Sequence, residues 1–169
     1  MSDRTANLLG VLGLAVADRI EAAAREIVNH AGETPAAVVV LGYASGMTND
    51  KLRRILRLSH PGSVRLIDRL VADGLAERRE GRDKRETALH LTKRGVAARE
   101  KLLAGRLAAI RVLLSPLSKD ENAQLAALIH KALHGQRTDD MDRYNLCRLC
   151  DDRVCTDCPI PAPKGPPGE

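Results

Sequence analysis

The stretch that decides the fold covers residues 48–92 and reads TNDKLRRILRLSHPGSVRLIDRLVADGLAERREGRDKRETALHLT. Thr48 and Ser59 are residue types that commonly cap the N-terminus of a helix, and each precedes a short run with helical spacing. The sequence therefore predicts two short helices, at 49–57 and 60–73. Two helices joined by so short a turn have the spacing of a helix-turn-helix unit.

The chain after Gly74 changes from a helical period to a period of two. Polar and apolar side chains alternate over 75–80 and again over 87–91, around a polar loop that contains glycine. This pattern is typical of a β-hairpin. A hairpin placed directly after the second helix completes a winged helix-turn-helix.

Long helices are predicted on both sides of this unit. Apolar residues recur every three or four positions over 6–30, 93–114 and 118–135, and Thr34 is a suitable N-cap for a further helix that ends near 45. The predicted fold class is mainly α with a β-hairpin wing and a helical dimerisation region. We divide the chain into N-terminal dimerisation and scaffold helices (1–47), a winged helix-turn-helix core (48–92), C-terminal dimerisation helices (93–135) and a cysteine- and proline-rich tail (136–169).

Composition narrows the possible functions of this chain. It has 169 residues with two Tyr, no Phe and no Trp, so its core consists of aliphatic side chains. Such a composition argues against surfaces that stack single-stranded nucleic acid on aromatic rings. No run of 18 apolar residues exists, and the apolar start continues as one helical stripe past any signal-peptide cleavage site. We expect no membrane span and a cytoplasmic location.

Basic charge is concentrated in the middle of the chain. Residues 48–99 hold 14 Lys and Arg against 7 Asp and Glu, whereas the remainder holds 13 against 15. A helix fits the major groove of double-stranded DNA, where the base edges are distinct, and nearby cations bind phosphates. We expect two sets of contacts with DNA. The phosphate contacts are expected from Arg53, Arg54, Arg57 and Arg69. The contacts near the minor groove are expected from the hairpin tip, with Arg82, Lys84 and Arg85.

The same residues carry a resemblance to a family. Residues 58–70 and 73–79 resemble the recognition helix and first wing strand of the MarR family of bacterial regulators. Residues 83–92, with Gly95, resemble its wing signature of Asp, any residue, Arg, then Leu-x-Leu-Thr-x-x-Gly. The resemblance covers roughly 6–134. It implies a homodimer formed by the first and the last two helices, with two winged helices on a pseudo-palindromic operator.

The resemblance also implies individual site residues. It places Ser59, His60, Gly62, Ser63 and Arg65 on or beside the groove-facing part of the recognition helix, makes Arg85 the wing arginine, and makes Asp83 the acid that orients it. One departure is that Ser63 stands where the family often has an apolar residue, with Val64 where it often has a small polar one. The complete set of predicted DNA-binding residues is Thr48, Arg53, Ser59, His60, Gly62, Ser63, Arg65, Arg69, Arg82, Lys84 and Arg85.

These observations predict a regulator of transcription and not an enzyme. We expect a repressor that binds as a homodimer and is released by a small-molecule inducer in the cleft between dimer helices and winged domain, or by metal or redox chemistry at the cysteines. The expected dimer stripes are Val96, Leu103, Leu107, Ile110 and Leu114 in one helix and Leu125, Leu128, Ile129 and Leu133 in the last. The alternatives are a thiol oxidoreductase and a metal-knuckle adaptor for protein partners.

All four cysteines lie close together near the C-terminus. Cys147 and Cys150 form one C-x-x-C pair, and Cys155 and Cys158 form a second pair four residues later. Four thiolates suit tetrahedral Zn²⁺, so a zinc site is our prediction. An iron–sulfur cluster also takes four cysteines, and redox-active thiols are a third interpretation.

Overall fold

A computed structural model describes residues 3–30, 32–81, 86–134, 140–155 and 157–160 of the chain. Its elements are, in order, α1 (Asp3–Val28), α2 (Thr34–Tyr43), β1 (Met47–Thr48), α3 (Asn49–Ile55), α4 (His60–Ala72), β2 (Ala76–Glu80), β3 (Thr87–Leu91), α5 (Lys93–Leu114), α6 (Lys119–His134) and α7 (Asp140–Leu146). The predicted fold class, mainly helical with a small β wing, is confirmed.

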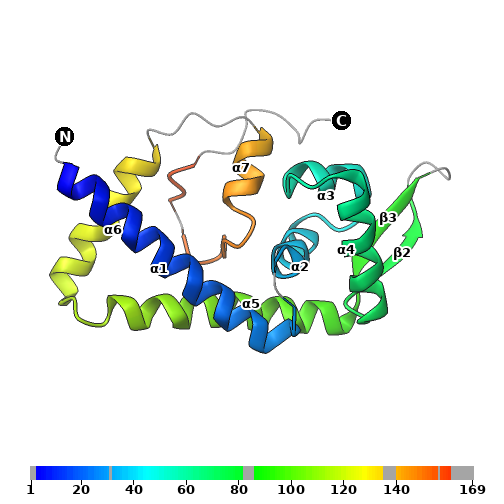
Figure 1. Ribbon diagram of the computed structural model, residues 1–169, viewed down its shortest axis with the longest axis horizontal. Coiled ribbons are helices and arrows are strands. Elements are labelled where there is room, and N and C mark those ends of the chain that lie inside the picture. The colour runs from blue at the N-terminus through cyan, green and yellow to red at the C-terminus, as the bar shows by residue number, and fades with distance from the viewer. Residues whose placement is uncertain (1–2, 31, 82–85, 135–139, 156, 161–169) are drawn as a thin grey trace.

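The molecule is elongated, with α5 as its long axis (Figure 1). The winged-helix elements gather at one end of α5, and α6 with the start of α1 lies at the other (Figure 1). Helix α2 is apolar all round and buried along nearly its whole length, from Thr34 to Leu41, which is typical of a helix enclosed by the core. The core therefore lies where α1, α2 and α5 meet the winged helix.

The three strands form an antiparallel sheet in the order β1–β3–β2. Ala76 pairs with Leu91 and Glu80 with Thr87 along the hairpin, while Met47 pairs with Leu89. The two-residue strand β1 directly before α3 was not predicted, because two residues are too few to show an alternation.

Thr92 ties the end of the hairpin to the start of α5. Its hydroxyl accepts a hydrogen bond from the N–H of Gly95 (3.0 Å) and donates one to the carbonyl of Gly74 (2.6 Å). Gly95 packs directly on the backbone carbonyl of Leu75, so a Cβ atom at this position would overlap that oxygen. The spacing Thr-x-x-Gly thus fixes the angle at which α5 leaves the wing.

Two predicted details differ from the structure. Thr34 is the first residue of α2 and not its N-cap: Glu33 takes the cap position, and the Thr34 side chain is fully buried. Leu103, which was expected in a dimer stripe, is 1% exposed and belongs to the core of the single chain. Over the described residues, none of the helices is both long enough and apolar enough to cross a membrane.

Candidate nucleic-acid interface

The first helix of the pair, α3, is fixed at both ends by local hydrogen bonds. The Thr48 side chain caps its start by accepting from the N–H of Lys51 (3.3 Å), as predicted for a helix at this point. At its end, the N–H of Leu58 donates to the carbonyl of Arg53 (3.0 Å) and the N–H of Arg57 to that of Arg54 (3.2 Å). Arg57 has a φ of 54°, so it occupies the left-handed position that usually favours glycine in this type of helix ending.

The second helix, α4, presents its N-terminus to solvent. The Ser59 side chain caps it by accepting from the N–H of Gly62 (3.2 Å). A Cβ atom on Gly62 would lie 3.1 Å from that hydroxyl oxygen, so the residue that lacks a side chain fits the capped turn. Ser59, His60 and Arg65 are exposed, as a surface that contacts a groove requires.

Ser63 does not share this exposed surface. Its side chain is 0% exposed, and its hydroxyl donates to the carbonyl of His60 within the helix (2.9 Å). The structure therefore places Ser63 against the interior and not on the groove-facing surface where the sequence had placed it. The physical reason is the helical period, because Ser63 shares the inner face with Ile67 and Leu70.

Two arginines of α4, Arg65 and Arg69, are exposed to solvent and could contact a ligand. Among the described residues, no ion pair involves Arg65 or Arg69. The acids nearest in sequence bind elsewhere, since Asp68 pairs with Arg78 of β2 (2.5 Å) and Asp73 with His30 (2.8 Å). Because a free guanidinium can bind a phosphate or a guanine without breaking an existing pair, these two side chains suit a polyanion.

Other predicted phosphate contacts are already paired. Arg53 binds Asp50 in the same helix (2.7 Å), and Arg57 forms an ion pair with Asp142 of α7. The pKa of Asp50 is lowered, chiefly by its hydrogen bond with Arg53. The wing residues Arg82, Asp83, Lys84 and Arg85 lie outside the described residues.

Comparison with known proteins supports the architecture. No family model matches the sequence, and no curated protein matches it. Solved structures do match. The MarR protein of E. coli in its apo form is 26% identical with a TM-score of 0.61, over 74% of this chain and 96% of that one. MepR of Staphylococcus aureus, a transcription regulator of the multidrug efflux pump MepA, is 20% identical with a TM-score of 0.69, over 76% and 95%. A MepR variant bound to an oligodeoxyribonucleotide is 20% identical with a TM-score of 0.60, over 76% and 95%.

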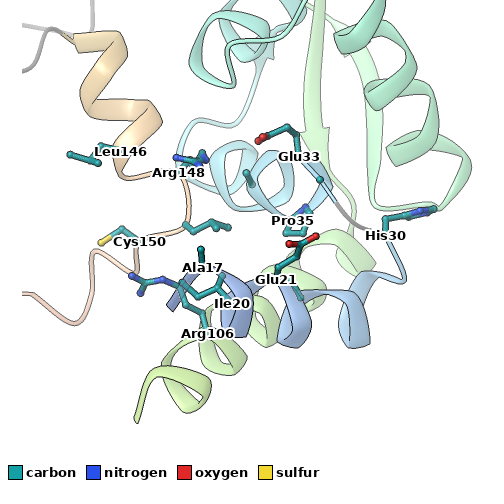
Figure 2. A pocket seen from close by; sticks show the side chains of 14 residues that line it. Ala17, Ile20, Glu21, His30, Glu33, Pro35, Arg106, Leu146, Arg148 and Cys150 are labelled. Atoms are coloured by element: carbon teal, nitrogen blue, oxygen red, sulfur yellow. The ribbon is translucent and has the colours of Figure 1, made fainter. Parts of the chain in front are cut away.

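The chain has the MarR-type winged-helix fold. Within this fold, a cavity of about 410 Å³ lies between α1, α2, α5 and the residues that follow α7 (Figure 2). Apolar side chains such as Ile20 and Leu149 line it, together with Glu21, Glu33 and Arg106. Charges of both signs beside an apolar wall suit a small ligand that is partly polar.

The cavity is connected to the recognition helix of this MarR-type fold through His30. His30 lines the cavity, and its Nε2 atom lies 2.8 Å from a carboxylate oxygen of Asp73. Asp73 is the C-cap of α4. Nothing in the spacing of the sequence indicated this contact, because the two residues are 43 positions apart.

The cysteines lie in a segment packed on the MarR-type body. We call residues 147–155 and 157–160 the cysteine segment; it follows α7 and lies between the two ends of the molecule (Figure 1). Cys147 and Cys150 are half-buried, Cys155 and Cys158 are exposed, and all four are free thiols. Sequence reasoning missed α7, because residues 136–146 are mostly polar and have no clear apolar stripe.

Proposed function

We propose that this chain is a sequence-specific, double-stranded DNA-binding regulator of transcription that acts in the cytoplasm as a repressor. In this proposal two copies place their α4 helices in successive major grooves of a pseudo-palindromic operator, with the wings beside the adjacent minor grooves. The protein binds and releases DNA and catalyses no reaction.

A single observation carries the proposal: the exposed side of α4 combines a capped start with two arginines that form no ion pair among the described residues. Ser59 fixes the first turn, and Arg65 and Arg69 point away from the core without a carboxylate partner among the described residues. Phosphate and base contacts require such groups, because desolvating an already paired arginine would cost its existing interaction. The MepR variant that is bound to an oligodeoxyribonucleotide has a similar fold.

Exposed apolar side chains support a homodimer. Leu8, Leu9, Val11 and Leu14 of α1 are each at least 55% exposed, and Leu128 of α6 is 66% exposed. Helix α6 has no buried residue at all within the single chain. A second copy that covers these helices would bury the apolar surface, and its two-fold symmetry would present two winged helices to one DNA molecule.

We propose that release of DNA follows binding of a small molecule in the cavity, or metal or redox chemistry at the cysteines. The cavity is bounded by α1, which carries part of the proposed dimer surface, by α5, and by the loop that contains His30. Its position therefore allows a ligand to change the spacing between two recognition helices.

The test is binding to a duplex selected from a random library, measured by fluorescence anisotropy at several salt concentrations. We expect the parent protein to prefer the selected duplex over a scrambled one, with affinity that falls steeply with salt. Arg65→Ala should weaken binding by about 1 to 3 kcal/mol if it contacts a base.

Lys101→Ala is the matched control. Lys101 is an exposed cation of α5 outside the interface, so its loss changes the net charge equally without removing a predicted contact. Its affinity should stay close to that of the parent protein. Equal affinities of the Arg65→Ala protein and the parent at the same salt concentration would contradict the role of Arg65.

A further inference from the structure

The cysteine segment is held against the body at several points. The Tyr43 hydroxyl of α2 donates a hydrogen bond to the carbonyl of Cys150. The Arg153 guanidinium forms an ion pair with Glu100 of α5 (2.9 Å), and Ile160 is only 7% exposed. The segment is therefore anchored at its first pair of cysteines, between the two pairs and after the second pair.

A hydrogen-bonded backbone turn joins the first pair of cysteines. The N–H of Cys147 donates to the carbonyl of Arg143 (2.9 Å), and the N–H of Cys150 donates to that of Cys147 (2.8 Å). Two cysteines separated by two residues across such a turn can present both sulfurs to one ion. Their half-buried setting keeps this pair in place.

The second pair of cysteines follows closely in the chain and is exposed at the surface. The Cys158 thiol donates to the nearby carbonyl of Ile160 (3.2 Å), and a carboxylate oxygen of Asp157, between the two cysteines, lies 3.2 Å from Nε2 of His130 in α6. Only four residues, 151–154, separate the two pairs of cysteines in the sequence, and this short connection limits the distance between the pairs.

The two pairs of cysteines do not form a closed site in the structure. Within the described ranges, no three or more His, Cys, Asp or Glu side chains lie close enough together to hold a metal ion. To close the site, the exposed second pair of cysteines must move towards the first pair. The turn that holds the first pair can stay in place. The donor set fits zinc, because four thiolates in two short pairs match its tetrahedral preference.

We propose that Cys147, Cys150, Cys155 and Cys158 bind one Zn²⁺ ion, and that the bound ion fixes α7 against α3. Each thiol that becomes a ligand releases its proton to solvent, and no electron is transferred. The ion would thus close a loop at the end of α7 and reduce the freedom of that helix. This site does not depend on DNA binding and goes beyond the function proposed above.

Helix α7 contacts the end of α3 directly. The Asn145 side-chain amide donates to the carbonyl of Ile55 (2.8 Å), one of the carbonyls that the end of a helix leaves without a partner inside it. Asp142 of α7 pairs with Arg57, the left-handed residue that follows α3. Tyr144 packs against the same core. A fixed α7 would therefore hold the first helix of the helix-turn-helix unit.

The metal is tested on the untagged, full-length protein purified without oxygen, by elemental analysis and a visible absorption spectrum. About one zinc per chain in a colourless sample is the expected result. Replacing zinc with Co²⁺ should produce strong thiolate-to-cobalt absorption and the bands of a tetrahedral ion. Iron with sulfide and a brown colour would overturn the zinc proposal, as would metal-free protein that keeps four titratable thiols in excess Zn²⁺.

Cys155→Ser tests the individual ligand with little risk to folding, because Cys155 is exposed. Losing a ligand should weaken zinc binding by more than the roughly 10- to 100-fold typical of losing an outer-shell partner. Val154→Ser changes an exposed neighbour that is not a ligand and should leave zinc affinity unchanged. Equal zinc affinity in the Cys155→Ser protein and the parent would overturn the four-ligand site.

Amide hydrogen exchange tests separately whether bound zinc fixes α7 against α3. Zinc should slow exchange of the amides of Cys147 and Leu58 several-fold, because the first lies at the end of α7 and the second closes α3. In Asn145→Ala, zinc stoichiometry should remain the same while the protection of Leu58 by zinc is lost. Exchange at Leu58 that does not depend on zinc in the parent protein would overturn the link.

Discussion

Gly95 shows how one residue sets the angle between the wing and α5. Its missing side chain lets the first turn of α5 rest on the carbonyl of Leu75, while Thr92 caps the same turn. A glycine inside a helix normally costs about 1 kcal/mol relative to alanine. Here the close approach of two backbones explains why a glycine stands at this position.

We predict that Gly95→Ala destabilises the protein. The added Cβ atom meets a backbone oxygen that cannot swing aside, and overpacking of this kind costs about 1 to 3 kcal/mol in the free energy of unfolding. Urea denaturation followed by circular dichroism measures the change. The control is Gly105→Ala in the same helix, whose Cβ would meet the flexible end of Ile27 at 3.1 Å and the Cβ atom of Ala23 at 4.0 Å. A Gly95→Ala protein as stable as the parent would refute the close packing.

At the same scale, individual residues show what the sequence could predict. Ser59 and Thr48 could be assigned as caps, because a cap depends only on the three residues that follow it. The position of Thr34 could not be predicted in this way. It lies inside the first turn of α2, a helix that the core encloses on all sides, so its burial depends on distant parts of the chain. The burial of Ser63 also depends on packing. The sequence did contain one indication of it, because the resembling family often has an apolar residue at this position.

At the scale of elements, α6 begins with a capping box formed by Ser118 and Glu121. Ser118 accepts from the N–H of Glu121 (3.3 Å), and the Glu121 carboxylate accepts from the N–H and the hydroxyl of Ser118, both at 2.8 Å. These two donors lower the pKa of Glu121, the backbone N–H first. The carboxylate form is thus favoured in the folded state.

We predict that Ser118→Ala raises the pKa of Glu121 part of the way back towards 4.5, because the hydroxyl donor is lost and the backbone donor remains. A lowered pKa in the folded state contributes stability above the ordinary pKa, and this is lost as the pH falls through the folded value. The stability difference between the two proteins should therefore shrink in acid. An NMR titration of the Glu121 carboxyl measures the shift.

Ser115→Ala is the matched control for this titration. The Ser115 hydroxyl donates to the carbonyl of Val112 (2.9 Å) and does not contact Glu121. The pKa of Glu121 should be the same in this variant as in the parent protein. An identical titration midpoint in the Ser118→Ala protein and the parent would show that the hydroxyl does not hold the carboxylate.

The elements missed from the sequence share a physical cause. Helix α7 has seven residues and few apolar ones, and it is held by contacts with distant parts of the chain, such as that between Asn145 and Ile55. Strand β1 exists only because β3 pairs with it. Short elements of this kind are stabilised by tertiary contacts, which local spacing cannot show. The long helices could be predicted because their stripes continue over many turns.

At the scale of the whole molecule, the single chain leaves one end without a core. The first half of α1 and all of α6 carry apolar side chains that remain in solvent. The winged helix at the other end shares one buried core with α1, α2 and α5. This asymmetry supports two copies joined at the helical end, with the winged helices free to contact DNA.

We predict that the parent protein sediments at twice the chain mass of 18.3 kDa. Leu128→Glu should shift it to the mass of one chain, because a charge would be buried in the dimer surface without a partner. Leu128 is 66% exposed, so the single chain should still fold. Ala127→Glu, an exposed position on the other side of α6, is the control and should remain a dimer. A Leu128→Glu protein that stays dimeric would place the interface elsewhere.

The central claim is that two α4 helices read one operator, and hydroxyl-radical footprinting on a selected duplex tests it most directly. We predict two protected half-sites related by two-fold symmetry, with centres about one helical turn apart on one face of the DNA, and one dimer bound per duplex. Protection should disappear at high salt. A single unsymmetrical footprint, or uniform protection that a scrambled duplex shows equally, would contradict the account.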